Sequence, residues 1–397
     1  MTLTRLAFAY ARRRPLSTLL VVILLAIGVA VVALTLIVSR ELEEKLTRDA
    51  QGIDLVVGAK GSPLQLVLAG VYHVDVPPGN IPLASVATLR ANRMIASVIP
   101  VSLGDSFRGY RIAGTEPAFI EHYGATLREG RLWDRPMEAV LGSAVAQASG
   151  LHVGATFTGS HGLAEGGGEH KEAAYTVAGI LAPTGTVIDR LVVTPLDSVW
   201  AVHEAHHAGA AKDEDEHREV TLALVRFASP LAAAGLARSI NKETELVAAS
   251  PAYETARLLT VLGFGVDLVR VFALLLMAAS GFMLLVALSQ ALEDRRYDLA
   301  ILRTLGASRR KVAWVLLVES VMLAAAGTVL GLLFAHLGAY AIGTWLPQAA
   351  PLATAAYRWL PEEWAVVALA LGAGILAALW PAWRAARLDV AATLADG

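Results

Sequence analysis

Four long apolar segments constrain this chain more than any other feature of its sequence. A helix needs roughly 20 mainly apolar residues to cross a bilayer core about 30 Å thick. Segments of that kind run over 16–38, 271–292, 312–337 and 364–383. Of the 397 residues, 17% are charged, against about 25% in ordinary soluble domains. We therefore predict an α-helical integral membrane protein with four spans, arranged as one plus three.

The first apolar segment has to be distinguished from a cleaved signal peptide, because three arginines precede it. Its apolar run exceeds the roughly 7–15 residues of a signal sequence. It also ends in Ser39, Arg40 and Glu41 instead of a small-residue cleavage site. We interpret 16–38 as a retained membrane anchor.

Positive charge in the short flanking segments predicts the orientation, because Lys and Arg concentrate on the cytoplasmic side. The 1–15 segment, the 293–311 loop and the 384–397 tail are basic, whereas the 338–363 loop has a single arginine and two glutamates. We predict cytoplasmic termini, with 338–363 and the long 39–270 segment outside. The supporting residues are Arg5, Arg12, Arg13, Arg14, Arg295, Arg296, Arg303, Arg309, Arg310, Lys311, Arg384 and Arg387.

The outside segment 39–270 is long enough to form a domain. It begins with RELEEKLTRDAQ and ends with SPAYETARLLTVLGFGVDLVR, two helical runs that we expect to form a stalk continuous with the neighbouring spans. Between them, short β-like runs such as IDLVVG and YTVAGIL alternate with helical runs such as GSAVAQASGL. These patterns predict a large external α+β domain between the first and second spans.

Nine of the ten histidines lie in this external segment, and an insertion near 197–220 is especially rich in them. Imidazole and carboxylate groups suit zinc. The alternative is a solvated polar segment whose histidines bind nothing. The candidate metal ligands are His203, His206, His207 and His217.

The sequence contains two stretches that partly match enzyme motifs, but neither match indicates an enzyme. Residues 203–207 read H-E-A-H-H and match H-E-x-x-H, but a zinc peptidase also needs a buried helix and a third ligand. Lys60 precedes Gly61, whereas a phosphate-binding loop places its lysine after the second glycine. The chain has no cysteine. We therefore predict no catalytic residue and no cofactor site in this chain.

A charged run, ALEDRRYDLAILRTLGASRRKV at 291–312, separates the second and third spans. Helical spacing places Leu299, Leu302 and Leu305 near one face of a short amphipathic helix that stops at Gly306. The positive-inside rule explains the arginines but neither the leucine spacing nor the acids. Such a helix can dock in a groove of a cytoplasmic partner. The candidate docking residues are Glu293, Arg295, Arg296, Asp298, Leu299, Leu302, Arg303, Leu305 and Gly306.

The third apolar segment contains an unexpected acid, Glu319. An intramembrane carboxylate is costly, and it normally meets a partner, packs through a hydrogen bond or reaches the membrane surface. The same segment holds Gly327 and Gly331, a G-x-x-x-G spacing that allows close helix contact within the chain or across a dimer.

Two motifs resemble signatures of the FtsX-like permease family. The charged run is similar to the family pattern between the second and third spans, with Asp298 where the family usually has Glu. The tail PAWRAARLDVAATLADG resembles the closing motif of the family, with Val390 in place of Pro. The stretch 115–155 resembles the external domain of the MacB type.

This resemblance implies the membrane subunit of an ABC transporter of the mechanotransmission class, in a bacterial inner membrane. Two permease chains would pair with two copies of a cytoplasmic ATPase, which would bind the ATP and seat on a coupling helix at 293–308. The cargo would be a lipoprotein, lipid, peptide or small molecule, handled with or without a periplasmic adaptor. The alternative function is a metal-responsive membrane module that binds zinc through the histidine-rich insertion.

Overall fold

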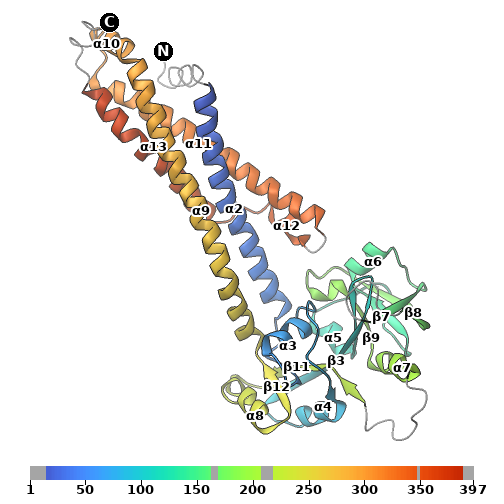
Figure 1. Ribbon diagram of the computed structural model, residues 1–397. Helices are drawn as coiled ribbons and strands as arrows, with labels where there is room; N and C mark the ends of the chain where they lie inside the picture. Colours follow the sequence, from blue (N-terminus) through green and yellow to red (C-terminus); the bar gives the residue numbers. More distant parts are fainter. Residues whose placement is uncertain (1–14, 162–168, 207–217, 347–348, 388–397) are drawn as a thin grey trace. The chain divides into compact units, whose positions relative to one another are not determined.

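The computed structural model describes residues 15–161, 169–206, 218–346 and 349–387. The chain divides into two compact units (Figure 1). We call Met1–Glu43 with Val261–Gly397 the helical unit, and Glu44–Thr260 the sheet unit.

The described part of the helical unit is built on four long helices. They are α2 (Pro15–Asp49), α9 (Pro251–Asp294), α11 (Arg309–Trp345) and α13 (Glu363–Ala386), and each is long and apolar enough to cross a membrane. Each predicted span lies within one of these helices. Two short helices complete the unit, α10 (Arg296–Thr304) and α12 (Pro351–Ala355).

Small residues let these helices pack closely. A methyl group added at Gly331 of α11 would lie 2.6 Å from the carbonyl oxygen of Ala26 in α2, and one added at Gly327 would lie 2.9 Å from the Leu25 side chain. The G-x-x-x-G face of α11 therefore packs against α2 of the same chain.

Polar contacts join α11 to the region around α13 at two levels. The Ser320 hydroxyl donates a 2.6 Å hydrogen bond to the carbonyl oxygen of Gly374. Farther along α11, His336 Nδ1 lies 2.8 Å from the carbonyl oxygen of Ala356, and its Nε2 lies 3.1 Å from the fully buried carboxylate of Glu363. These contacts satisfy polar groups that would be costly to leave unpaired inside the unit.

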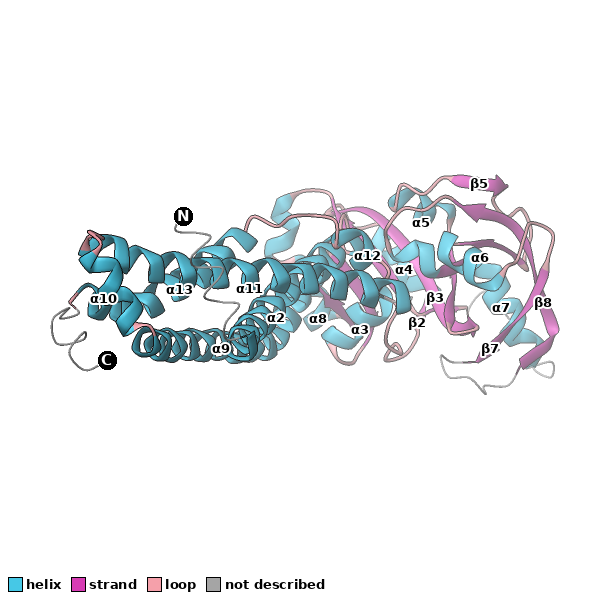
Figure 2. Ribbon diagram, turned by 90° about the horizontal axis from the view of Figure 1, so that it is seen from above, coloured by secondary structure: helices cyan, strands magenta, loops and turns pink. Residues whose placement is uncertain are grey.

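The described strands belong to the sheet unit, as Figure 2 shows in magenta. Its main sheet has ten strands, ordered β12-β1-β11-β3-β4-β9-β6-β8-β5, with β7 pairing β3 and β8. The pairs β4–β9 and β6–β8 are parallel, and the other described pairs are antiparallel. The strands are β1 (Leu55–Ala59), β3 (Ile95–Phe107), β4 (Tyr110–Thr115), β5 (Leu127–Gly130), β6 (Glu138–Leu141), β7 (Thr156–His161), β8 (Glu169–Leu181), β9 (Leu191–Pro195), β11 (Leu222–Phe227) and β12 (Leu246–Ala249). A second, two-stranded sheet pairs β2 (Ile81–Pro82) with β10 (Glu219–Val220).

Short helices connect the strands of this unit. They are α3 (Pro63–Gly70), α4 (Leu83–Arg90), α5 (Pro117–His122), α6 (Ser143–Ser149), α7 (Leu196–His206) and α8 (Leu236–Glu243), with 3-10 turns at Val187–Arg190 and Pro230–Ala234. The structure thus confirms the predicted fold class, four apolar helices with a large α+β domain between the first and second.

Strand β1 shows why its sequence is apolar without a break. Val56 packs in one core cluster with Phe119 and Leu66, whereas Leu55 and Val57 pack in another. Alternate side chains of a strand point to opposite faces of the sheet. Both faces of β1 are therefore buried. A polar side chain at any of its central positions would face one of the two cores.

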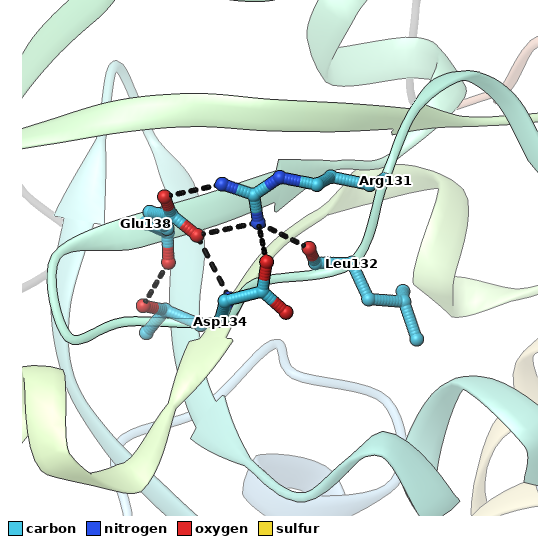
Figure 3. Close-up of polar contacts among 5 residues, drawn as sticks. Arg131, Leu132, Asp134 and Glu138 are labelled. Atoms are coloured by element: carbon cyan, nitrogen blue, oxygen red, sulfur yellow. Dashed lines mark hydrogen bonds and ion pairs between the residues drawn. The ribbon is translucent and has the colours of Figure 1, made fainter.

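A charged brace closes the loop between β5 and β6 (Figure 3). The Arg131 guanidinium donates to both carboxylate oxygens of Glu138, at 2.7 and 2.8 Å, and to the carbonyl oxygen of Leu132. Glu138 also accepts a hydrogen bond from the backbone N–H of Asp134. The hydrogen bond from Arg131 and the one from Asp134 lower the pKa of Glu138 to about 2.

Acid is expected to weaken this brace, because the ionised form of Glu138 is the one that the fold stabilises. Its folded pKa lies below the ordinary 4.5, so its contribution is complete above 4.5 and is lost as the pH falls toward 2. Glu138→Gln should therefore flatten the acid side of the stability profile, measured as the unfolding midpoint from about pH 2 to pH 6. Glu245→Gln, in the exposed pair with Lys60, is the control. Equal acid slopes for wild type and Glu138→Gln would contradict this role.

Candidate coupling site

The charged run between α9 and α11 folds as a bend, a short helix and a tight turn. Helix α9 ends at Asp294, and Arg295 leaves helical geometry with φ −108° and ψ 9° before α10 begins. After α10, Gly306 adopts φ +96°, a left-handed conformation that favours glycine. Ser308 then caps α11 by accepting a hydrogen bond from the backbone N–H of Lys311. In Figure 1, α10 lies at the end of the helical unit where the described part of α13 also ends.

One face of α10 is buried in the helical unit. Leu299 is 3% exposed and Ala300 is fully buried. Leu299 packs in a cluster with residues of α9 and α11 that include Leu288 and Leu316, and Leu302 packs partly against the same cluster. Apolar burial therefore fixes α10 to its own bundle.

The opposite face of α10 is exposed and mixes apolar with charged side chains. Leu305, just past the helix, is 78% exposed. The prediction that Leu305 shares a face with Leu299 is wrong, because three-residue steps drift around a helix of 3.6 residues per turn and α10 has ended at Thr304. The exposed side chains are those of Arg296, Tyr297, Asp298, Ile301, Thr304 and Leu305.

Arg295 and Glu319, predicted separately as a docking residue and an intramembrane acid, form one buried ion pair. The two guanidinium nitrogens lie 3.0 and 3.5 Å from the two carboxylate oxygens. Arg295 is 8% exposed and Glu319 is 4% exposed. The pair compensates the cost of burying each charge alone, and it explains why α11 carries an acid among apolar residues.

Glu293 finds its partners within the chain. Its carboxylate lies 3.1 Å from Arg296 in α10 and 3.1 Å from Arg384 in α13. These two contacts hold the end of α9 against α10 and α13, and Arg384 lies at the basic end of the last predicted span. Asp298 is exposed, and Arg303 is partly buried and has polar contacts of its own.

The predicted metal ligands fall largely outside the described residues. The backbone of α7 includes His203 and His206, whereas His207 and His217 lie outside the described ranges. Within 15–161, 169–206, 218–346 and 349–387, no three His, Asp or Glu side chains form a metal-binding group. The zinc site stays a prediction.

In the sheet unit, Tyr72 joins the last turn of α2 to the first turn of α9. Its hydroxyl lies 2.6 Å from the Thr255 hydroxyl and 3.3 Å from the carbonyl oxygen of Leu46. The buried carboxylate of Asp49, at the end of α2, accepts a 2.8 Å hydrogen bond from the backbone N–H of Val187. The ends of α2 and α9 that belong to the sheet unit are therefore held in it by polar contacts.

Comparison with known families matches both units. The profile of the FtsX-like permease C-terminal domain matches residues 270–390, and that of the MacB-like periplasmic core domain matches 18–243, more than half of the chain. The chain is a MacB-type permease of the FtsX-like family. It is accordingly a multi-pass membrane protein of the ABC transporter permease class.

Solved structures similar to this MacB-type permease cover about half of it. One is the periplasmic region of MacB from Actinobacillus actinomycetemcomitans, 14% identical over 54% of this chain and 97% of that one, with a TM-score of 0.35. Another is the extracellular domain of the noncanonical ABC-type transporter YknZ from Gram-positive bacteria, 10% identical over 50% and 98% of the two chains, with a TM-score of 0.31. The search among curated proteins gave no match.

Proposed function

We propose that this permease couples a separate cytoplasmic ATPase to movements of its periplasmic domain. The ATPase binds and hydrolyses the ATP, and the permease has no nucleotide site of its own. The work serves the export, extraction or release of a lipoprotein, lipid, peptide or small molecule. Two copies of the ATPase serve two permease chains, and a periplasmic adaptor or substrate protein is the external partner.

This proposal rests on the difference between the buried face and the exposed face of α10. Its inner face is held in the bundle through Leu299, whereas its outer face presents Ile301 and Leu305, 37% and 78% exposed, among charged side chains. Apolar residues within a polar surround are typical of a partner surface. A permease of the ABC class requires an ATPase, and α10 is the segment that offers such a surface between two spans.

The distribution of positive charge supports placing α10 on the cytoplasmic side of the inner membrane. Arg303 lies in its last turn, Arg309, Arg310 and Lys311 follow it in the sequence, and Arg384 lies against Glu293 nearby. The positive-inside rule then assigns both termini to the cytoplasm and the sheet unit to the periplasm.

Helices α2 and α9 are the proposed transmitters of motion. Each contributes residues to both units, and α9 is continuous over 44 residues, about 66 Å at 1.5 Å per residue. Within the sheet unit, Tyr72 contacts both helices. Small displacements of packed rigid helices are an established way to carry a conformational change over distance.

Leu305→Asp and Ile301→Asp are expected to weaken binding of the ATPase about tenfold or more each, because a charge replaces an apolar side chain of the proposed docking surface. The measurement is the affinity of the purified full-length permease, in nanodiscs, for the ATPase with which it co-purifies. Stimulated ATP hydrolysis at subsaturating permease should fall in parallel.

Tyr357→Asp is the matched control, because this side chain is 80% exposed and lies beyond the far end of α11, away from α10. It should bind the ATPase as wild type does. Unchanged affinity in Leu305→Asp and Ile301→Asp would refute docking on α10.

A further inference from the structure

Arg295 occupies the joint between α9 and α10. The backbone on its two sides stays hydrogen-bonded, since Arg295 N–H donates to the carbonyl oxygen of Leu292 at 3.2 Å and Leu299 N–H donates to that of Arg295 at 2.9 Å. The residue itself leaves helical geometry. A change in the angle between the two helices therefore centres on Arg295.

The side chain of Arg295 connects this joint to the third span. It pairs with Glu319 of α11 in the buried interior. The next residue of α11, Ser320, is fully buried and donates to the backbone of α13 at Gly374. The contacts thus run from the joint to α11 and from α11 to α13.

Two adjacent arginines of one motif have opposite environments. Arg295 is buried against Glu319, whereas the Arg296 side chain is 49% exposed and pairs with Glu293, which is 42% exposed. Separating a buried ion pair leaves uncompensated charges and is strongly unfavourable. An exposed pair is screened by water and salt and contributes little. The Arg295–Glu319 pair can therefore resist a displacement that the Arg296–Glu293 pair cannot.

A small cavity adjoins the buried pair on the side of α2 and α9. Its volume is about 20 Å³, and its lining includes Arg295 and Glu319 with Thr18 of α2 and Leu288 of α9. That space has room for about one water molecule. The space beside the pair is therefore lined mainly by α2 and α9, together with Leu323 of α11, and the contact between Arg295 and Glu319 stays direct.

We infer that Arg295 is a positioning residue: its ion pair with Glu319 locks the joint, so that displacement of α10 becomes displacement of α11. Arg295 does not contact the ATPase in this scheme. The inference rests on the proposed function, because it specifies how a push on the exposed face of α10 reaches the spans.

A charge swap in the full-length permease tests this role. Arg295→Glu, Glu319→Arg and the double variant are each reconstituted in nanodiscs with the co-purifying ATPase. Each single variant should lose about tenfold or more of the stimulated hydrolysis at saturating permease, while its affinity for the ATPase stays near that of wild type. The double variant should recover most of the stimulation, because the pair is restored with reversed polarity.

A second measurement covers the case in which Arg295→Glu or Glu319→Arg alone fails to fold properly. It is the unfolding equilibrium of the same variants in detergent. The double-mutant cycle should show about tenfold or more coupling in the unfolding equilibrium constant. Glu319→Gln, which keeps the shape of the side chain, is the milder variant for the hydrolysis assay. Arg296→Glu is the matched comparison, and it should change the affinity for the ATPase more than the stimulation at saturation.

The outcomes separate this inference from the proposed function. Full stimulation in Arg295→Glu, absence of recovery in a folded double variant, or a loss of affinity parallel to the loss of stimulation would each overturn the positioning role. A wild-type permease that binds no ATPase would overturn the proposed function itself, and the inference with it.

Discussion

Replacing Phe119 with alanine is expected to destabilise the sheet unit by about 3–5 kcal/mol, the usual range for a buried phenylalanine. Phe119, in α5, is fully buried in a core cluster with Leu66 and Val56. Its ring meets Tyr123 edge-on, with 5.2 Å between the ring centroids. The substitution leaves a cavity next to strands of the main sheet, such as β1, and these hydrogen-bonded strands cannot move in to fill it. Thermal or chemical unfolding of the full chain in detergent measures the effect.

Leu231→Ala is the control for Phe119→Ala, because Leu231 belongs to the same unit and is 85% exposed. Its effect should stay within about 0.5 kcal/mol. Phe119→Leu should fall between the two, since it fills part of the cavity. A change below about 1 kcal/mol for Phe119→Ala would show that α5 does not close this core.

Replacing Gly331 with leucine is expected to destabilise the helical unit by about 3 kcal/mol, the upper part of the range for overpacking. The first added carbon would already lie 2.6 Å from the carbonyl oxygen of Ala26. Backbone cannot yield as a flexible side chain does, so α2 and α11 must separate. Unfolding of the purified permease by a denaturing detergent measures the loss.

Gly331→Ala and Gly338→Ala give a matched pair within α11. Both substitutions gain the same helix propensity, up to about 1 kcal/mol. A methyl group at Gly338 makes only an ordinary contact, 3.8 Å from Leu34, whereas at Gly331 it collides with α2. Gly338→Ala should therefore be neutral or stabilising, and Gly331→Ala destabilising. Equal effects of the two would contradict close packing at Gly331.

In the charged run, the backbone features could be predicted from the sequence, whereas the contacts with distant residues could not. Its helix, its glycine stop and the Ser308 cap follow from local rules of backbone conformation and hydrogen bonding, and the structure has them all. The separation of the exposed Leu305 from the buried Leu299 was not predicted, because it depends on where α10 ends. The pairing of Arg295 with Glu319 was not predicted either, since the two residues are 24 positions apart and meet only when α9 and α11 pack.

The sequence by itself determined the four apolar helices, the α+β domain between the first two and the family, because apolar length, strand alternation and short motifs are local properties of the chain. Only the tertiary structure decided which charges of the motif are buried and which are exposed. It also decided that Gly327 and Gly331 face α2 and that Tyr72 joins α2 to α9. These are contacts between residues distant in sequence, and helix packing sets them through the shapes of both partners.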